Sequence, residues 1–242
     1  MLKTNQIRLV FACTVLLTLF GLTACSQQPA PQVIYLTFDD GPDPKFTPSL
    51  LDVLEKHGVK ATLFVTGENA EKHPEIVRSA FEAGHTIGNH SYQHGRASDM
   101  SFEEIAQSYE RTDKIIRSIT GQQEILFRAP YLDISPDNRS YLCKVGSNSV
   151  DIDMMGWDWE TQDPLEIIDN ILHKQATNAP ETELNPVVLL HDSGQGEFGT
   201  RQGTVDATDM FIPMMLAKGF VFADEPPAHK WQLSEKDCSG VK

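Results

Sequence analysis

Residues 33–42 read VIYLTFDDGP, an apolar run that ends in two carboxylates and a Gly-Pro turn. A nearly unbroken apolar run is typical of a β-strand that is covered on both faces. A second run of this kind, PVVLL, occupies residues 186–190 and ends before His191. Such strands occur in parallel sheets with helices on both faces, so these two stretches favour an α/β fold.

From residue 33 onward, short apolar runs alternate with helical patterns. Strands are predicted at 33–38, 61–66, 85–88, 124–128, 150–158, 186–190 and 220–223. Helices are predicted at 48–57, 74–83, 101–120, 136–145, 164–178 and 207–218, with prolines near several starts and glycines just past most ends. About seven strands favour a distorted or incomplete (β/α) barrel over an open doubly wound sheet.

The composition excludes several classes of partner. The 242 residues include 34 Asp and Glu against 20 Lys and Arg, for a formal net charge of −14. Nucleic-acid binding rests on clustered Lys and Arg, so we expect no nucleic-acid partner. Four cysteines are too few for a disulfide scaffold of this size. Cys143 and Cys238 either pair outside the cytoplasm or remain thiols, and both readings stay open.

The N-terminus has the pattern of a targeting segment. Residues 1–24 carry two positive charges and no acidic residue, and their apolar run is too short for a comfortable membrane span. The ending LTAC resembles the lipobox of bacterial lipoproteins, in which Cys25 becomes the lipid-modified first residue. An ordinary secretory peptide cleaved near Ala24, or an uncleaved anchor, is the alternative. We expect a signal peptide over 1–24, a tether over 25–32 and a lipid-anchored protein of the bacterial cell envelope. If the organism is Gram-negative, we expect the anchor to lie in the outer membrane.

Polar side chains gather where successive predicted strands end. In a parallel barrel these ends open on one face, where the active sites of such folds lie. The residues are Asp39, Asp40, His90, His94, Arg128, Asp158, His191 and Asp192. This repeated placement favours an enzyme.

His90 and His94 have the i, i+4 spacing of two metal ligands on one face of a helix. A carboxylate would complete a site of two His and one Asp that leaves positions open for water and substrate. Asp39 and Asp40 are adjacent and point in different directions, so one can bind the metal while the other serves as general base. His191 is then available as general acid.

Four motifs in this order resemble the polysaccharide deacetylase family, also called the NodB homology domain or carbohydrate esterase family 4. The resemblance covers about residues 33–223, and we assign 33–242 to the catalytic domain. The motifs are TFDDGP at 37–42, HSYQH at 90–94, RAPY at 128–131 and LLHD at 189–192.

The resemblance implies a role for each motif residue. Asp39 would be the general base and Arg128 its partner, and His191 would protonate the leaving amine. The backbone N–H of Tyr131 would stabilise the oxyanion, while Leu189 and Pro130 would contact the substrate. The metal would be bound by Asp40, His90 and His94. We expect zinc, with cobalt, nickel or another divalent ion as alternatives.

The chain departs from the family pattern at two places. The third motif reads RAPYL where RPPYG is usual. A further motif of the family, between RAPY and LLHD, usually ends in Asp-Trp, and here it ends in Asp163-Pro164, without the usual Trp. Asp163 would support His191, although Asp163-Pro164 also reads as a helix start. Trp157 or Trp159 would replace the missing Trp, and pleat alternation lets only one of them face the pocket.

The expected function is a metal-dependent polysaccharide N-deacetylase acting on peptidoglycan, poly-N-acetylglucosamine or a chitin-like polymer. The alternatives are an O-acetyl esterase on a glycan such as acetylated xylan, and a non-catalytic glycan-binding lipoprotein. We expect the protein to be a monomer.

Overall fold

A computed structural model describes residues 32–147, 149–173, 185–194, 199–227 and 238. Within them the strands are β1 (Val33–Asp39), β2 (Thr62–Val65), β3 (Thr86–Asn89), β4 (Met154–Met155), β5 (Val187–His191) and β6 (Val221–Ala223). The helices are α1 (Phe46–His57), α2 (Gly67–Lys72), α3 (Pro74–Glu82), α4 (Phe102–Thr120), α5 (Pro136–Val145), α6 (Pro164–His173) and α7 (Gln202–Ala217). Two 3-10 turns, η1 (Ala97–Asp99) and η2 (Pro130–Leu132), complete them.

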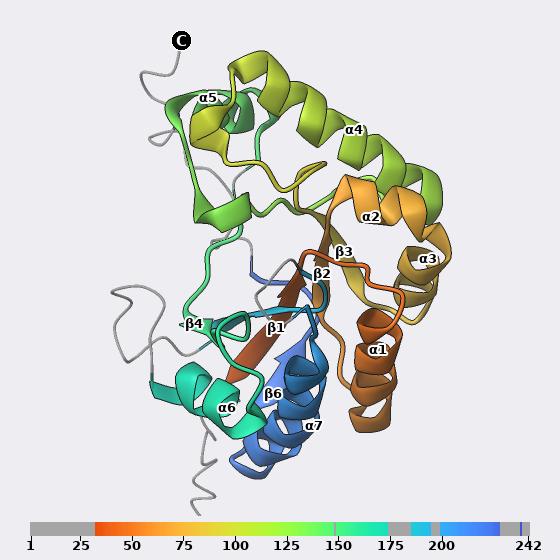
Figure 1. The fold of residues 1–242 in the computed structure, drawn as a ribbon, viewed down its shortest axis with the longest axis vertical. Coiled ribbons are helices and arrows are strands. Elements are labelled where there is room, and N and C mark those ends of the chain that lie inside the picture. Colours follow the sequence, from red (N-terminus) through yellow and green to blue (C-terminus); the bar gives the residue numbers. More distant parts are fainter. Residues whose placement is uncertain (1–31, 148, 174–184, 195–198, 228–237, 239–242) are drawn as a thin grey trace, which may run out of the picture. The chain divides into compact units, whose positions relative to one another are not determined.

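The strands form one parallel sheet in the order β3-β2-β1-β5-β4, and β6 pairs with the first half of β1. Single bridges connect Asn89 at the end of β3 to Phe127, and Phe127 to Ser149, shortly before β4. Because these bridges return the sheet towards β4 and β5, the fold is a distorted α/β barrel, as predicted (Figure 1).

Alternation along β1 and β5 separates the two sides of the sheet. One set of side chains from these strands packs with α1, α6 and α7 and includes Ile34, Leu36, Phe38, Val188 and Leu190. The alternate set forms a second cluster inside the barrel, with Tyr35, Phe64, Val187 and Leu189 among its members. Asp39 and His191 continue this inner set, because β1 and β5 pair with Asp39 opposite His191.

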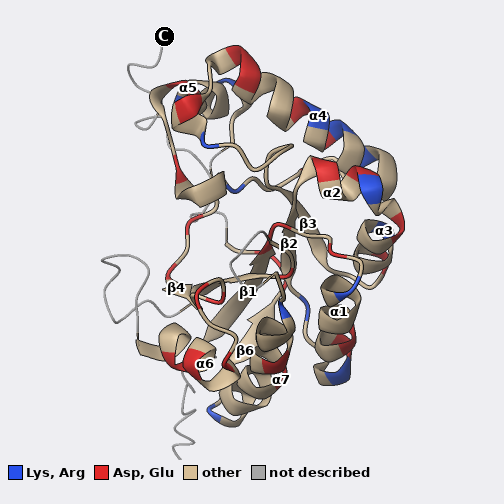
Figure 2. Cartoon of the chain, in the orientation of Figure 1, with Lys and Arg blue, Asp and Glu red and all other residues tan. Residues whose placement is uncertain are grey.

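Helix boundaries follow local signals. Pro74, Pro136 and Pro164 are the first residues of α3, α5 and α6, as predicted. Ser101 and Glu104 form the capping box that begins α4, and Gly121 ends that helix in the left-handed region. Charged residues of both signs lie along the helices, as Figure 2 shows for α4.

Several predicted boundaries were wrong. Residues 124–128 form only the bridge at Phe127, because Pro130 follows closely and pairing there is limited to a few hydrogen bonds. Residues 150–158 contain a strand of only two residues, since a turn begins at Asp158. Helix α1 begins at Phe46, before Pro48, and α7 begins at Gln202. Helix α2 was not predicted, and the predicted end of the 164–178 helix lies outside the described residues.

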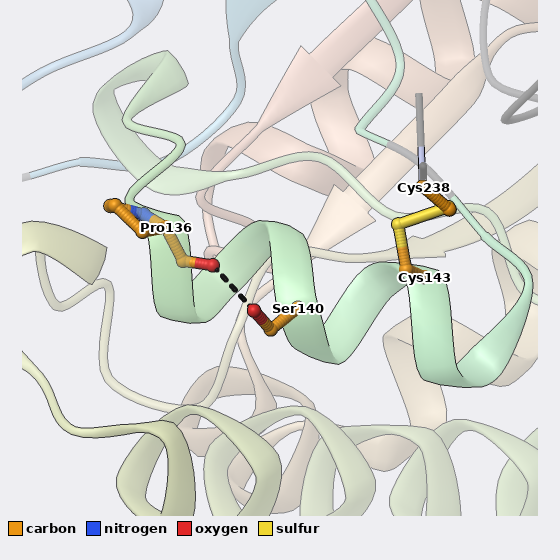
Figure 3. The surroundings of a disulfide bond; sticks show 4 residues. All are labelled: Pro136, Ser140, Cys143 and Cys238. Atoms are coloured by element: carbon orange, nitrogen blue, oxygen red, sulfur yellow. Dashed lines mark hydrogen bonds between the residues drawn. A yellow bond between two sulfur atoms is a disulfide. The ribbon is translucent and has the colours of Figure 1, made fainter. Parts of the chain in front are cut away.

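Cys143 at the end of α5 forms a disulfide with Cys238, with a Cα–Cα distance of 5.7 Å (Figure 3). This resolves the choice between a bond and two thiols that the sequence leaves open. No helix among the described residues is long and apolar enough to cross a membrane. Residues 1–31, and with them the predicted signal peptide and Cys25, lie outside the described part of the chain.

Candidate active site

Asp39 and Arg128 form a buried ion pair at the mouth of the barrel. The guanidinium Nη1 of Arg128 donates to Asp39 Oδ1 at 2.8 Å and to Thr37 Oγ1 at 2.7 Å. The guanidinium also stacks 4.2 Å from the ring centroid of Phe64. Arg128 is fully buried and Asp39 is 3% exposed. Burial lowers the pKa of Arg128, and the negative charge of Asp39 opposes that shift. The pair fixes the orientation of the Asp39 carboxylate.

Asp40, His90 and His94 lie together beside this pair. Their candidate ligand atoms all lie within 4.8 Å of one another. Asp40 Oδ1 lies 3.1 Å from His94 Nε2 and 3.5 Å from His90 Nε2. The i, i+4 spacing of the two histidines suggested a helix, but neither of them lies on one. They belong to a loop with left-handed residues at Ser91 and His94, stabilised by the His94 N–H bond to Ser91 Oγ.

The chemistry of these donors fits a divalent cation such as zinc. His90 Nδ1 donates to the carbonyl oxygen of Arg128 at 2.9 Å, which leaves the lone pair of Nε2 for a metal. Asp40 Oδ1 is buried and accepts no hydrogen bond from the described residues. Burial lowers the pKa of His94 and so favours its neutral, ligating form. One carboxylate and two imidazoles leave room for water and substrate in a zinc site.

His191 is held by Asp158. Its Nδ1 donates to Asp158 Oδ1 at 2.8 Å, and its backbone N–H donates to Oδ2 at 2.8 Å. Thr204 Oγ1 also donates to Oδ2, at 2.7 Å. Burial works to lower the pKa of His191, but the Asp158 carboxylate, together with the charges of Asp40 and Asp39, outweighs it and raises that pKa to about 9. Burial works to raise the pKa of Asp158, and the histidine and its other donors bring it below the usual value. His191 is therefore a protonated acid at neutral pH.

The prediction that Asp163 supports His191 was wrong. Asp163 Oδ1 accepts the N–H of Leu165 at the start of α6, which is the helix-cap role that the sequence left open. Asp158 takes the place next to His191 because β4 leads into a turn there, and this turn brings its buried carboxylate onto the end of β5. Asp158 was visible in the sequence as a strand-end carboxylate, but without a role.

Aromatic residues lie on two sides of the polar groups. The Trp159 ring packs edge-on against His191 with centroids 5.2 Å apart, and Trp157 packs on Trp159. Trp157 and Trp159 lie on either side of Asp158, where a turn begins, and not in a strand. The strand alternation that was predicted to point them in opposite directions therefore does not apply. Tyr131 is 53% exposed and packs edge-on against the His94 ring at 4.5 Å.

Two expected substrate contacts and the oxyanion donor can also be placed. Leu189 is buried inside the barrel two residues before His191, and Pro130 is buried at the start of η2. The backbone N–H of Tyr131 has no hydrogen-bond acceptor among the described residues, so it is available to a ligand. Tyr131 itself is in the left-handed region, with φ 58°.

Asp192 is a further carboxylate of this region to which the sequence assigned no role. It is 1% exposed and accepts a hydrogen bond from Thr47 Oγ1 at 2.5 Å. Burial, with the nearby charges of Asp40 and Asp39, raises its pKa to about 7.

The family model described as Polysaccharide deacetylase matches residues 26–150. A peptidoglycan-N-acetylglucosamine deacetylase of Bacillus cereus is 35% identical over 193 residues, which are 80% of this chain and 66% of that protein. A chitooligosaccharide deacetylase of Sinorhizobium fredii is 32% identical over 207 residues, which are 83% of this chain and 93% of that protein.

Solved structures give the same picture. A crystal structure of a peptidoglycan N-acetylglucosamine deacetylase superposes with a TM-score of 0.72 at 34% identity, covering 80% of this chain and 86% of that one. A family 4 acetyl xylan esterase from Clostridium thermocellum in complex with a cobalt ion superposes with a TM-score of 0.66 at 29% identity, covering 79% and 87%.

Proposed function

The chain belongs to the polysaccharide deacetylase family, and from this premise we propose that it hydrolyses N-acetyl groups on a cell-envelope polysaccharide, with peptidoglycan as the preferred substrate. One observation carries the proposal. The Asp39–Arg128 pair, the cluster of Asp40, His90 and His94, and the Asp158–His191 pair converge at one end of the barrel. A base, a metal site and an acid are the groups that amide hydrolysis requires.

Each side chain has a distinct task in this reaction. Asp39, oriented by Arg128, takes a proton from the attacking water. The N–H of Tyr131 donates to the oxyanion of the tetrahedral intermediate. His191, held by Asp158, gives its proton to the leaving nitrogen.

Asp40, His90 and His94 would hold a divalent ion, which would supply Lewis-acid polarisation of the acetyl carbonyl and would lower the pKa of the attacking water. We propose zinc as that ion, with cobalt or nickel able to substitute. The cobalt ion in complex with the Clostridium thermocellum esterase supports a divalent metal.

Relatives named for peptidoglycan and chitooligosaccharide support an N-acetylated glycan as the substrate. The second candidate function is O-acetyl ester hydrolysis, which the likeness to an acetyl xylan esterase favours. Both reactions use the same base and metal. The amide needs the acid His191 more, because an amine is a poorer leaving group than an alcohol.

We also propose that the mature protein is a monomer, begins at Cys25 and is tethered to a bacterial membrane by lipid on that residue. The LTAC sequence at 22–25 supports this anchor. Intact-mass measurement of protein extracted from membranes is the test. A mature chain that begins elsewhere, or a Cys25→Ser variant that still partitions into detergent, would contradict it.

The function is tested by measuring acetate release from peptidoglycan, chitooligosaccharides, poly-N-acetylglucosamine and acetylated xylan, with and without a chelator. We expect chelator-sensitive release, highest on peptidoglycan. Release from acetylated xylan alone would favour the esterase, and no release from any glycan would favour a binding protein.

A further inference from the structure

Asp192 has no task in the reaction above, yet its buried carboxylate lies against the loop that carries Asp40. We propose that Asp192 and Thr47 are positioning residues. They contact the loop 40–43 at Gly41 and Asp43, and this support, which we call the brace, sets the geometry of the metal ligand Asp40. This inference rests on the proposed function.

The first observation is direct contact between Asp192 and Gly41. A Cβ atom built on Gly41 would collide with both carboxylate oxygens and approach Asp192 Cγ to 2.8 Å. Gly41 is not among the residues with positive φ. The side chain of Asp192 therefore limits the space at this position, whereas the backbone conformation of Gly41 does not call for glycine.

The second observation is the set of bonds that hold this loop. Thr47 Oγ1, on the first turn of α1, donates to Asp192 Oδ2 and accepts the N–H of Asp43 at 2.8 Å. On the other side, Thr66 N–H donates to the Gly41 carbonyl at 3.0 Å, and Asn69 Nδ2 donates to the Asp40 carbonyl at 2.8 Å. The backbone of Asp40 is thus fixed from both sides in the left-handed region, with φ 76°. A conformation of this kind persists only where the surroundings impose it.

The third observation is the unfavourable environment of Asp192. It is 1% exposed, and its Oδ1 accepts no hydrogen bond from the described residues. A buried carboxylate oxygen without a partner lowers stability. A residue that lowers stability beside a metal-binding loop is better explained by function than by packing.

The decisive measurement is the dissociation constant for Zn²⁺, obtained by competition with a chromogenic chelator. We expect Asp192→Ala and Thr47→Val to weaken Zn²⁺ binding by about 10–100-fold, the usual effect of losing a residue that orients a metal ligand. Thr47→Ser keeps the hydroxyl and should bind Zn²⁺ almost as the wild type does. We expect kcat on the best acetylated glycan to fall in Asp192→Ala and Thr47→Val with little change in KM.

Asp153 provides a matched control. It is also a buried carboxylate, and it accepts the N–H of Val187 at the opposite end of β5 from Asp192. Asp153→Ala should lower the denaturation temperature and leave Zn²⁺ affinity unchanged. If it weakens Zn²⁺ binding as much as Asp192→Ala, the effect is general destabilisation and the brace is wrong.

A double-mutant cycle tests the contact itself. Gly41→Ala should impair Zn²⁺ binding in the wild type and do much less harm in the Asp192→Ala background, where the colliding atoms are absent. If Gly41→Ala and Asp192→Ala have additive effects on the free energy of Zn²⁺ binding, the proposed brace is wrong. It is also wrong if Thr47→Val has the wild-type dissociation constant for Zn²⁺. If Asp192→Ala does not fold, the pair Thr47→Val and Thr47→Ser decides alone. A wild type that binds Zn²⁺ but releases no acetate would contradict the proposed function and leave these affinity comparisons valid.

Discussion

His191 Nδ1 donates a hydrogen bond of 2.8 Å to Asp158, which stands in a turn 33 residues earlier in the chain. The same carboxylate also accepts the backbone N–H of His191. This double contact fixes the ring, and Nε2 makes no hydrogen bond to the described residues. It also raises the pKa of His191 to about 9 against the opposing effect of burial.

The first prediction concerns the pH profile. In the proposed reaction His191 acts in its protonated form, which is present below its pKa, so a raised pKa would extend activity to higher pH. Asp158→Asn removes the charge that raises the pKa, and the alkaline limb of kcat should move to lower pH. Asp163→Asn is the control, because it removes the charge of a carboxylate that caps α6 and keeps the Oδ1 acceptor of that cap. A profile of Asp158→Asn that overlays the wild type would contradict this role.

The same pair predicts a pH dependence of stability. A histidine whose folded pKa is raised from 6.5 to about 9 stabilises the fold fully below pH 6.5 and loses that contribution as the pH rises through 9. The free energy of unfolding, measured by urea denaturation, should fall over this interval. It should fall less in Asp158→Asn. Equal slopes in the two proteins would show that another group is responsible.

A third prediction concerns the metal ligands. His90→Ala and His94→Ala should each lose most bound metal, measured by elemental analysis of purified protein, and most activity. His57→Ala is a suitable control, since that histidine pairs with Asp209 on α7. A double variant at His90 and His94 that retains stoichiometric metal would exclude the site.

A fourth prediction concerns the buried ion pair of Asp39 and Arg128. Arg128→Leu leaves the Asp39 carboxylate buried without its partner and should destabilise the protein by about 3–5 kcal/mol. Asp39→Asn keeps hydrogen-bond acceptors for the guanidinium, so it should remain folded while losing about 10²–10⁴-fold in kcat. Denaturation curves and steady-state kinetics distinguish the two effects. An active Asp39→Asn variant would show that the base is another group.

Much of this site follows from one regularity of parallel sheets. Their strands present their carboxyl ends on a common edge, so Asp39, Asp40, His90, His94 and His191 could be grouped from strand ends alone. The register that places Asp39 opposite His191 then follows from pairing β1 with β5.

The errors come from non-local geometry. The turn at Asp158 depends on a left-handed Trp157, with φ 54°, and no propensity predicts that conformation for tryptophan. From the sequence alone, Asp163, five residues after Asp158, was an equally reasonable candidate for the carboxylate that supports His191. The short helix α2 carries no apolar periodicity over its six residues, so no pattern identifies it. The disulfide joins residues separated by 95 positions, a distance in sequence that says nothing of proximity in space.

The central claim is that this site removes acetyl groups from amide nitrogen. The most direct test compares acetate release from N-acetylated peptidoglycan by the Zn²⁺-loaded wild type and by His191→Ala, with an O-acetylated glycan as the second substrate. We predict release from both substrates by the wild type, a loss of about 10²–10⁴-fold on the amide in His191→Ala and a smaller loss on the ester. Release from the ester alone by the wild type, or equal activity of His191→Ala and wild type on the amide, would contradict the claim.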